Sequence, residues 1–263
     1  MNRFKLVPAL LILVVFVNAC QNNSSTKKEI SNQNLFDSLT FSYEDEKKDS
    51  NSYFKMNYVL LDCKGFDKTI NDSINTDLRS FIFEVEPSLT KSLQQLTEES
   101  KTNLVNEYHT QLSDFPENYN GYDHDIDQNY IFKNNQFISL EVIRYSFAAG
   151  AHGMGWTEYL HHDLKTGKKL FLSDFIQSQN KLIEIAEVEF RKQMNLKKTD
   201  NLEENGFWFT NNKFHINENF CFRNDSIEFL YNQYEIAPFS IGPIGLKVPL
   251  NAIKSDLKQE MFK

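Results

Sequence analysis

The stretch QFISLEVIRYSFAAGAHGMGWTEYLHHD, residues 136–163, decides the fold because two strand-like segments flank a glycine-rich loop within it. Residues 136–147 and 156–164 have the composition and spacing that are typical of strands. Just before them, Asn134 and Asn135 form a pair that tolerates the positive φ of a tight hairpin turn. The stretch therefore predicts an antiparallel meander that begins near residue 130.

The residues on the N-terminal side of this meander predict one strand and two helices. Residues 51–66 alternate between apolar and polar side chains, as a strand does. In the next two segments apolar residues recur every three or four positions, which is typical of one buried helix face. Pro87 separates the two predicted helices, Ser88 is the expected N-cap of the second, and Pro116 ends it.

On the C-terminal side, residues 165–168 are an expected turn, and Ser173 or Asp174 is the expected cap of a further helix. From residue 207 onward the apolar pattern returns to a period of two, which predicts more strands. The order strand, helices, sheet, helix, sheet predicts an α+β fold with mainly antiparallel sheets, packed helices and two related subdomains. We place these subdomains at residues 51–147 and 148–263.

The first residues have the form of a bacterial lipoprotein signal. Arg3 and Lys5 precede an apolar run over residues 6–17, and small residues then lead to Cys20. We expect residues 1–19 to be removed as a signal peptide, Cys20 to carry a lipid anchor, and residues 20–50 to be a flexible tether. The apolar run is too short to remain as a spanning helix. The alternative is a plain secretory signal in which the cysteine is incidental.

The leader and the composition limit the compartment and the partners. We expect a lipid-anchored protein of the cell envelope, on the outer-membrane or periplasmic face or at the cell surface, since Gln21 gives no aspartate-type retention signal. The net charge of −8 argues against a nucleic-acid partner. An acidic surface suits a cationic partner, although modest acidity also keeps a protein soluble. Cys63 and Cys221 form either one disulfide or two buried free thiols.

The loop AAGAHGMGW, residues 148–156, is the densest candidate site. Gly150 and Gly153 flank His152, and the loop ends at Trp156. Glycine permits positive φ and a close approach of another backbone or a ligand, so the loop is either a structural bend or a recognition loop. It is not a phosphate-binding loop, because it lacks the GxxxxGK[ST] pattern and no helix follows it directly.

The strand after this loop places Tyr159, His161 and Asp163 on one face, because side chains of a strand alternate. A histidine and a carboxylate on one face raise the hypothesis of a metal site, with His152 as a third ligand. The sequence has no HExxH motif and no paired cysteines, so we expect no metal and no cofactor. The alternative is a partly buried histidine that is bonded to a neighbouring carboxylate or carbonyl.

Signatures of hydrolytic catalysis are missing from the sequence. It contains no GxSxG elbow, and its downstream cysteines lie in apolar patterns that raise a thiol pKa. Asp123, His124, Asp125 and Asp127 are expected to form a solvated acidic loop, with loose binding of a cation as the alternative. We therefore do not expect an enzyme.

The segment YNQYEIAPFSIGP, residues 231–243, is a second candidate for binding. Its two prolines and its glycine make it a rigid connection between two predicted strands. Tyr234 and Glu235 are its candidate binding residues. Among aromatic neighbours, Glu235 is expected to be a buried acceptor that shapes the loop rather than a catalytic acid.

Two segments carry a resemblance to known envelope proteins. AAGAHGMGWTEYLHHDLKTGKKLFLSDFI, residues 148–176, and FLYNQYEIAPFSIGPIGLKVPL, residues 229–250, resemble the extracellular domain of RsiV-type anti-sigma factors. Residues 52–147 resemble the small domain N-terminal to the catalytic part of PdaC-type peptidoglycan deacetylases. The resemblance implies a two-part α+β fold and, in the RsiV-like case, binding of lysozyme, which is strongly cationic. It implies neither transmembrane anti-sigma signalling nor deacetylase activity.

These features lead to three hypotheses about function. The first is a lipid-anchored cell-envelope binding module that recognises a lysozyme-like muramidase or a cell-wall glycan such as peptidoglycan. The second is an enzyme acting on cell-wall material, with Tyr159, His161 and Asp163 as its polar centre. The third is a structural lipoprotein whose partner is another envelope protein.

Overall fold

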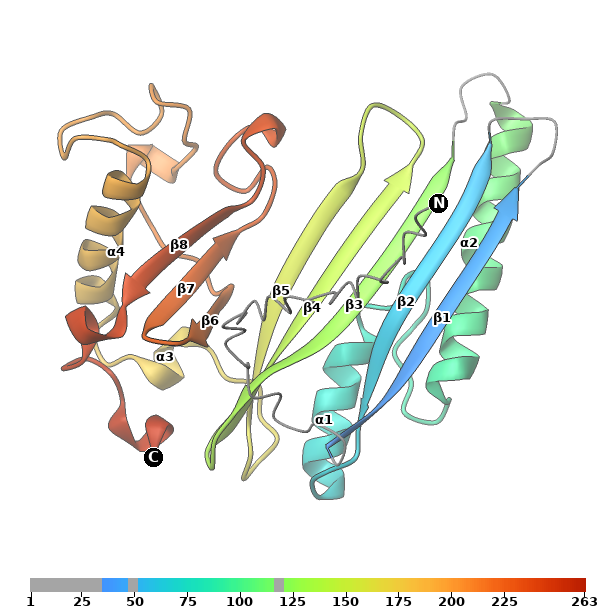
Figure 1. Ribbon diagram of the computed structural model, residues 1–263, viewed down its shortest axis with the longest axis horizontal. Coiled ribbons are helices and arrows are strands. Elements are labelled where there is room, and N and C mark those ends of the chain that lie inside the picture. Colours follow the sequence, from blue (N-terminus) through green and yellow to red (C-terminus); the bar gives the residue numbers. More distant parts are fainter. Residues whose placement is uncertain (1–34, 47–51, 116–120) are drawn as a thin grey trace, which may run out of the picture. The chain divides into compact units, whose positions relative to one another are not determined.

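The computed structural model describes residues 35–46, 52–115 and 121–263. Within these residues, five strands form one sheet in the order β1-β2-β3-β4-β5, and three strands form a second sheet in the order β6-β7-β8 (Figure 1). The predicted signal peptide, Cys20 and the first part of the predicted tether lie outside them. Among the described helices, none has both the length and the apolar character needed to cross a membrane.

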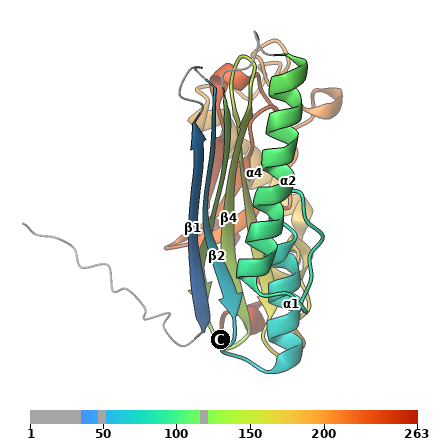
Figure 2. The ribbon, with the colours of Figure 1, turned by 90° about the vertical axis from the view of Figure 1, so that its right-hand side faces the viewer.

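The five-stranded sheet is mixed rather than purely antiparallel. β2 and β3 run parallel, and the other neighbouring pairs are antiparallel. A parallel pair needs a crossover connection. Two helices supply it, and both lie on one face of the sheet (Figure 2). The strands and helices of this part are β1 (Phe36–Glu46), β2 (Tyr53–Cys63), α1 (Lys68–Arg79), α2 (Leu93–Asp114), β3 (Tyr122–Lys133), β4 (Phe137–Ala148) and β5 (Met154–Asp163).

Both helices begin at side-chain caps, and the cap of the second differs from the one that the sequence predicted. Asp67 caps α1, and Ser92, rather than Ser88, caps α2 with a full capping box. The first helix was expected to continue to Pro87, yet α1 ends at Arg79. The buried Arg79 guanidinium donates to the carbonyl of Lys91 at 3.1 Å and to Asp62 at 2.8 Å. These bonds hold the segment between α1 and α2 against the C-terminal end of α1.

The prediction of a flexible tether up to residue 50 is wrong for β1. This strand pairs with β2 along its whole length, from Phe36 opposite Cys63 to Glu46 opposite Tyr53. Its apolar side chains at Leu39, Phe41 and Tyr43 alternate with polar ones and pack against the core on the helix side. The alternation was present in the sequence, but the surrounding polar residues concealed it.

β4 and β5 form the meander that residues 136–163 predict, and they pair from Phe137–Asp163 to Ser146–Met154. Asn134 holds the preceding turn, because its Oδ1 accepts from the backbone N–H groups of Gln136 and Phe137 at 2.8 and 2.9 Å. The subdomain boundary that we drew at residue 148 is therefore misplaced, since it separates two paired strands. The five-stranded sheet ends with β5.

The acidic cluster expected in a loop lies on β3 instead. His124 and Ile126 are buried on the helix side, whereas Asp123, Asp125 and Asp127 project from the opposite face of the strand. The prediction failed because a run of aspartates has low strand propensity. Burial of the alternate residues outweighs that preference.

The second subdomain packs the three-stranded sheet against one helix. The expected helix after residue 173 is divided into a single turn and a longer helix, and its buried face contains Leu182, Ala186 and Phe190. Phe137 of β4 belongs to the same core, so β4 contributes to both cores. The predicted α+β class with two subdomains is confirmed. The elements here are α3 (Leu172–Phe175), α4 (Gln179–Gln193), β6 (Phe220–Arg223), β7 (Ser226–Tyr231) and β8 (Ile244–Pro249), with short 3-10 turns at Thr210–Asn212, Phe239–Ile241, Leu250–Ile253 and Gln259–Phe262.

Candidate functional site

β5 is the last strand of the large sheet, and amide side chains of the second subdomain occupy its outer edge. The Oδ1 atom of Asn232 accepts from the Thr157 N–H at 2.8 Å, and its Nδ2 donates to the Thr157 carbonyl at 3.0 Å. Asn219 bonds the Tyr159 N–H at 3.0 Å and the same carbonyl at 2.8 Å. These amides take the place of a sixth strand, because they satisfy edge groups that would otherwise be unpaired. They also fix the second subdomain against β5.

The two candidate loops come together at the start of β5. The His152 ring stacks on Phe239 with a centroid distance of 3.7 Å and an angle of 14°. The Tyr234 hydroxyl lies 3.4 Å from His152 Nε2. Tyr234 adopts a φ of 64°, and Gly150 a φ of 99°. His152 of the glycine-rich loop and Tyr234 of the 231–243 connection are 82 positions apart in sequence, and the two segments thus form one surface.

Gly153 packs closely against the end of the Tyr145 side chain. A Cβ atom at this position would lie 2.2 Å from the hydroxyl oxygen of Tyr145. The Tyr145 ring therefore lies directly over the loop backbone. A larger residue at position 153 would therefore have to displace the Tyr145 ring.

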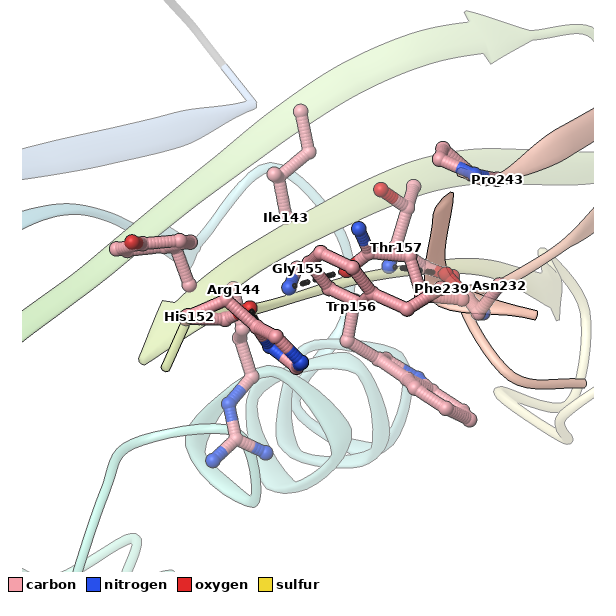
Figure 3. Close-up of a pocket in the computed structure, with 12 residues that line it drawn as sticks. Ile143, Arg144, His152, Gly155, Trp156, Thr157, Asn232, Phe239 and Pro243 are labelled. Carbon is pink, nitrogen blue, oxygen red and sulfur yellow. Dashed lines mark hydrogen bonds between the residues drawn. The ribbon is translucent and has the colours of Figure 1, made fainter. Parts of the chain in front are cut away.

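Two adjoining hollows lie along this surface, and we call them together the Trp156 groove. The first measures about 600 Å³ and is walled by β4, β5, the glycine-rich loop and the 231–243 connection (Figure 3). The second measures about 450 Å³, shares Trp156 and Asn232 with the first, and extends to residues 169–171 and 217–219. Large apolar side chains are exposed on both faces of the sheet here, Met154 and Trp156 on one face and Ile143 and Tyr145 on the other. Phe171 and Tyr234 are exposed on the elements beside them.

Glu235 shapes the connection, as expected, but it is exposed rather than buried. Its carboxylate accepts from the Asn232 N–H at 2.8 Å and from the Asn217 amide at 2.7 Å. The carboxylate therefore holds the turn that presents Asn232 to β5. Water reaches it because Tyr234 and Glu235 lie on the outer side of the turn.

His161 lies at the opposite end of β5 and is only 1% exposed. Its Nε2 lies 2.8 Å from the Phe220 carbonyl and its Nδ1 lies 2.8 Å from the Ser139 hydroxyl. The carbonyl can only accept, so Nε2 donates and Nδ1 accepts from Ser139. Burial lowers the pKa of His161 to about 4. The alternative that we gave for this face, a buried histidine satisfied by a carbonyl, is the one observed.

Tyr159 and Asp163 do not join His161 in a common centre. Asp163 Oδ1 accepts from the Lys165 and Thr166 N–H groups and from the Thr166 hydroxyl, so it caps the turn after β5. Burial alone would raise the Asp163 pKa, but these hydrogen bonds lower it below its ordinary value. Burial raises the pKa of Tyr159, whose hydroxyl is directed to Cys221. The three residues share a face of β5 but have separate partners.

The described residues contain no group of three or more histidine, cysteine or acidic side chains that could hold a metal ion. Cys63 and Cys221 are both free and buried. Burial raises their pKa values to about 12 and about 11. Of the two alternatives that the sequence left open, two buried thiols are the one observed.

His152, Gly153, Trp156 and Tyr234 were predicted from the sequence as candidate binding residues, and the structure brings them together. The other residues that complete the groove were not predicted; they are Ile143, Tyr145, Phe239 and the bridging amides Asn219 and Asn232. Phe239 was part of the quoted connection, but nothing in the pattern indicated a stack on His152. The amides carry no periodic signal, because their function depends on a strand edge that is distant in the sequence.

Comparison with known proteins identifies two domains. Residues 46–155 match the family model described as deacetylase PdaC, and residues 168–251 match the model of DUF3298, a family of proteins of unknown function. The resemblance to the PdaC-type domain is thereby confirmed. The relationship to a lysozyme-binding RsiV-type domain stays a prediction. No curated protein matches the chain.

Solved structures of the DUF3298 family have the same fold. A member from Bacteroides fragilis superposes with a TM-score of 0.69 at 22% identity, over 84% of this chain and 92% of that one. A member from Pseudomonas aeruginosa PAO1 gives a TM-score of 0.55 at 16% identity, over 86% and 96%. Likeness at this identity concerns the fold alone. Together the PdaC and DUF3298 domains suggest a cell-envelope-associated protein.

Proposed function

We propose that this chain is a lipid-anchored binding module of the cell envelope, and that the Trp156 groove takes its ligand. The ligand is a lysozyme-like muramidase or the peptidoglycan on which such an enzyme acts. The observation that carries the proposal is the convergence of two distant loops on an exposed tryptophan. Exposed apolar surface bordered by polar groups marks interaction sites in soluble proteins.

The composition of the groove supports binding of a large ligand. Trp156 is 44% exposed and Tyr234 is 46% exposed, and both residue types are enriched among side chains that dominate binding energy. The groove backbone is held by Gln233 and Asn232, so it needs little ordering when a ligand arrives. The net charge of −8 would attract a cationic protein at long range.

A binding role is favoured over catalysis by the environment of the polar side chains. His161 has no free ring nitrogen, and Asp163 is held in a turn. Both cysteine thiols have raised pKa values, which disfavours a thiolate nucleophile. The anchor proposed at Cys20 would hold the module at a membrane surface.

The test is calorimetric titration of the chain with a c-type lysozyme and, separately, with soluble peptidoglycan fragments. We expect at least one of them to bind, and Trp156→Ala to weaken that binding about tenfold or more, as loss of a central aromatic side chain does. Trp208 is the matched control, since it is 47% exposed and lies outside the groove. Trp208→Ala should bind as the unchanged chain does.

Two results would contradict the proposal. If neither ligand gives binding heat, the proposed binding function is wrong. If Trp156→Ala and Trp208→Ala weaken binding equally, the groove is not the binding site. Titration at low and at high salt distinguishes the binding of lysozyme from the binding of a glycan. Binding of the cationic enzyme should weaken with salt, whereas apolar contacts to a glycan should depend on salt much less.

A further inference from the structure

Arg144 is the unusual charge beside the Trp156 groove. It lies on β4 directly opposite Trp156 of β5, so both side chains project from the same face of the sheet. Figure 3 shows these two on one side of the strands, with Ile143 and Thr157 on the other. Both residues line the first hollow of the groove.

Arg144 differs from the other described arginines in having no counterion. Arg79, Arg191 and Arg223 each reach a carboxylate oxygen at 2.7 or 2.8 Å. Over residues 35–46, 52–115 and 121–263, no hydrogen bond or ion pair involves the Arg144 guanidinium. Its Nε is buried without a partner, as are the Nε atoms of Arg79 and Arg223, so the missing counterion is what sets it apart. The terminal nitrogens are not among the buried unsatisfied atoms, which leaves them open to an incoming group.

The guanidinium is nevertheless held in a defined position. Its central carbon lies 4.0 Å from the centroid of the Phe83 ring, in a cation–π contact. Glu84 and Glu158 act on it through their charge, but neither comes within ion-pair distance. A half-buried cation without a paired anion is unfavourable, and the other arginines of the described residues are paired. A bound anion would remove that penalty.

We infer that Arg144 is an anion-binding residue of the groove and that it receives a carboxylate of the ligand. This inference rests on the proposed function, since it specifies which ligand the groove accepts. A guanidinium binds a carboxylate through two parallel N–H···O bonds. A singly charged anion fits better than a phosphate dianion, because Arg144 is one cation with two acidic residues nearby. The exposed Trp156 ring beside it would cover an adjacent sugar or apolar group.

In cell-wall material this carboxylate has two sources, the lactyl group of N-acetylmuramic acid and the end of a stem peptide. Two probe pairs distinguish them. The first is the disaccharide of N-acetylglucosamine and N-acetylmuramic acid with its lactyl methyl ester. The second is acetyl-lysyl-D-alanyl-D-alanine with its C-terminal amide. In each pair one carboxylate is replaced by an uncharged ester or amide, and the rest of the molecule is the same.

The experiment is titration of each probe into the full chain, into Arg144→Gln and into Arg144→Lys. We expect one acid to bind about tenfold more tightly than its uncharged partner, which is the discrimination that one charge-assisted pair supplies. Arg144→Gln should abolish that difference, and Arg144→Lys should keep part of it. Lys198→Gln is the matched control, because it removes one exposed positive charge outside the groove.

The outcomes separate this inference from the proposed function. If acid and uncharged probes bind equally and Trp156→Ala still weakens both, the carboxylate role is wrong and the groove function stands. If neither probe binds while lysozyme does, the carboxylate role is again wrong. If Arg144→Gln and Lys198→Gln lose the acid preference equally, the effect comes from net charge and Arg144 has no special role. Unchanged melting temperatures of both variants would exclude unfolding as the cause.

Discussion

The two ends of β5 differ in exposure and in role. At its start, Met154 and Trp156 are 37% and 44% exposed beside the groove, whereas at its end His161 and His162 are 1% and 0% exposed. The histidine end is the more suggestive of chemistry in the sequence, yet its side chains hold the two subdomains together. The difference teaches that the neighbouring element decides the role of a polar side chain. β6 and α3 cover the histidine end, and a loop pair leaves the tryptophan end open.

The largest expected effect is at the buried end. His161→Ala should lower the free energy of unfolding by about 3 kcal/mol, because it removes a buried ring and leaves the Ser139 hydroxyl and the Phe220 carbonyl without partners. His152→Ala, at the exposed end, should change it by less than about 1 kcal/mol. Urea denaturation measures both. Equal losses in the two variants would mean that the ends do not differ in the way the structure indicates.

A smaller effect should appear when pH is lowered. Burial lowers the pKa of His161 and of His124 from 6.5 to about 4, with Arg144 adding to the effect at His124. The unfolded chain therefore takes up more protons than the folded one between these values, and stability falls as pH decreases through that window. From pH 6.5 to 5 we expect a loss of up to about 2 kcal/mol for each histidine.

His124→Asn tests this linkage, since it removes one titrating group and keeps a polar side chain of similar size. Its unfolding free energy should fall less steeply between pH 6.5 and 5 than that of the unchanged chain. The range stops at pH 5 because carboxylates titrate below it. Parallel slopes for the two chains would show that folding does not lower the pKa of His124.

Much of the fold was available in the sequence, because its elements depend on local pattern. The meander, both helices before it and the α+β class follow from periods of two and of three to four residues. The predictions that were wrong concern strands whose neighbours are distant in the sequence. β1 was hidden among polar residues until β2 supplied its neighbour, and β3 ran through aspartates that alternate with buried residues.

The candidate site was predictable in its loops but not in its connections. Glycine and proline mark shaped loops directly, so the segments around His152 and Tyr234 could be singled out. That the two loops meet is a tertiary fact, and no short-range pattern reports it. The isolation of Arg144 is likewise invisible in the sequence, because it is defined by which carboxylates fail to reach it.

The smallest expected effect concerns the amide of Asn232, which links the second subdomain to the edge of β5 at Thr157. Asn232→Ala removes both amide bonds to Thr157 and should lower the free energy of unfolding by about 1 kcal/mol, since water can replace part of what is lost at a strand edge. The local signal should be clearer than the global one. Hydrogen exchange of the Thr157 amide should become faster, while that of Leu160 in the buried half stays unchanged.

The exposed Asn251 provides the control, because Asn251→Ala alters no contact to β5. Unchanged exchange at Thr157 in the Asn232 variant would mean that the amide does not protect the edge. Accelerated exchange at both Thr157 and Leu160 would mean that the whole strand opens as one unit. Only a change confined to Thr157 fits a strand whose buried end is rigid and whose exposed end is held by side chains.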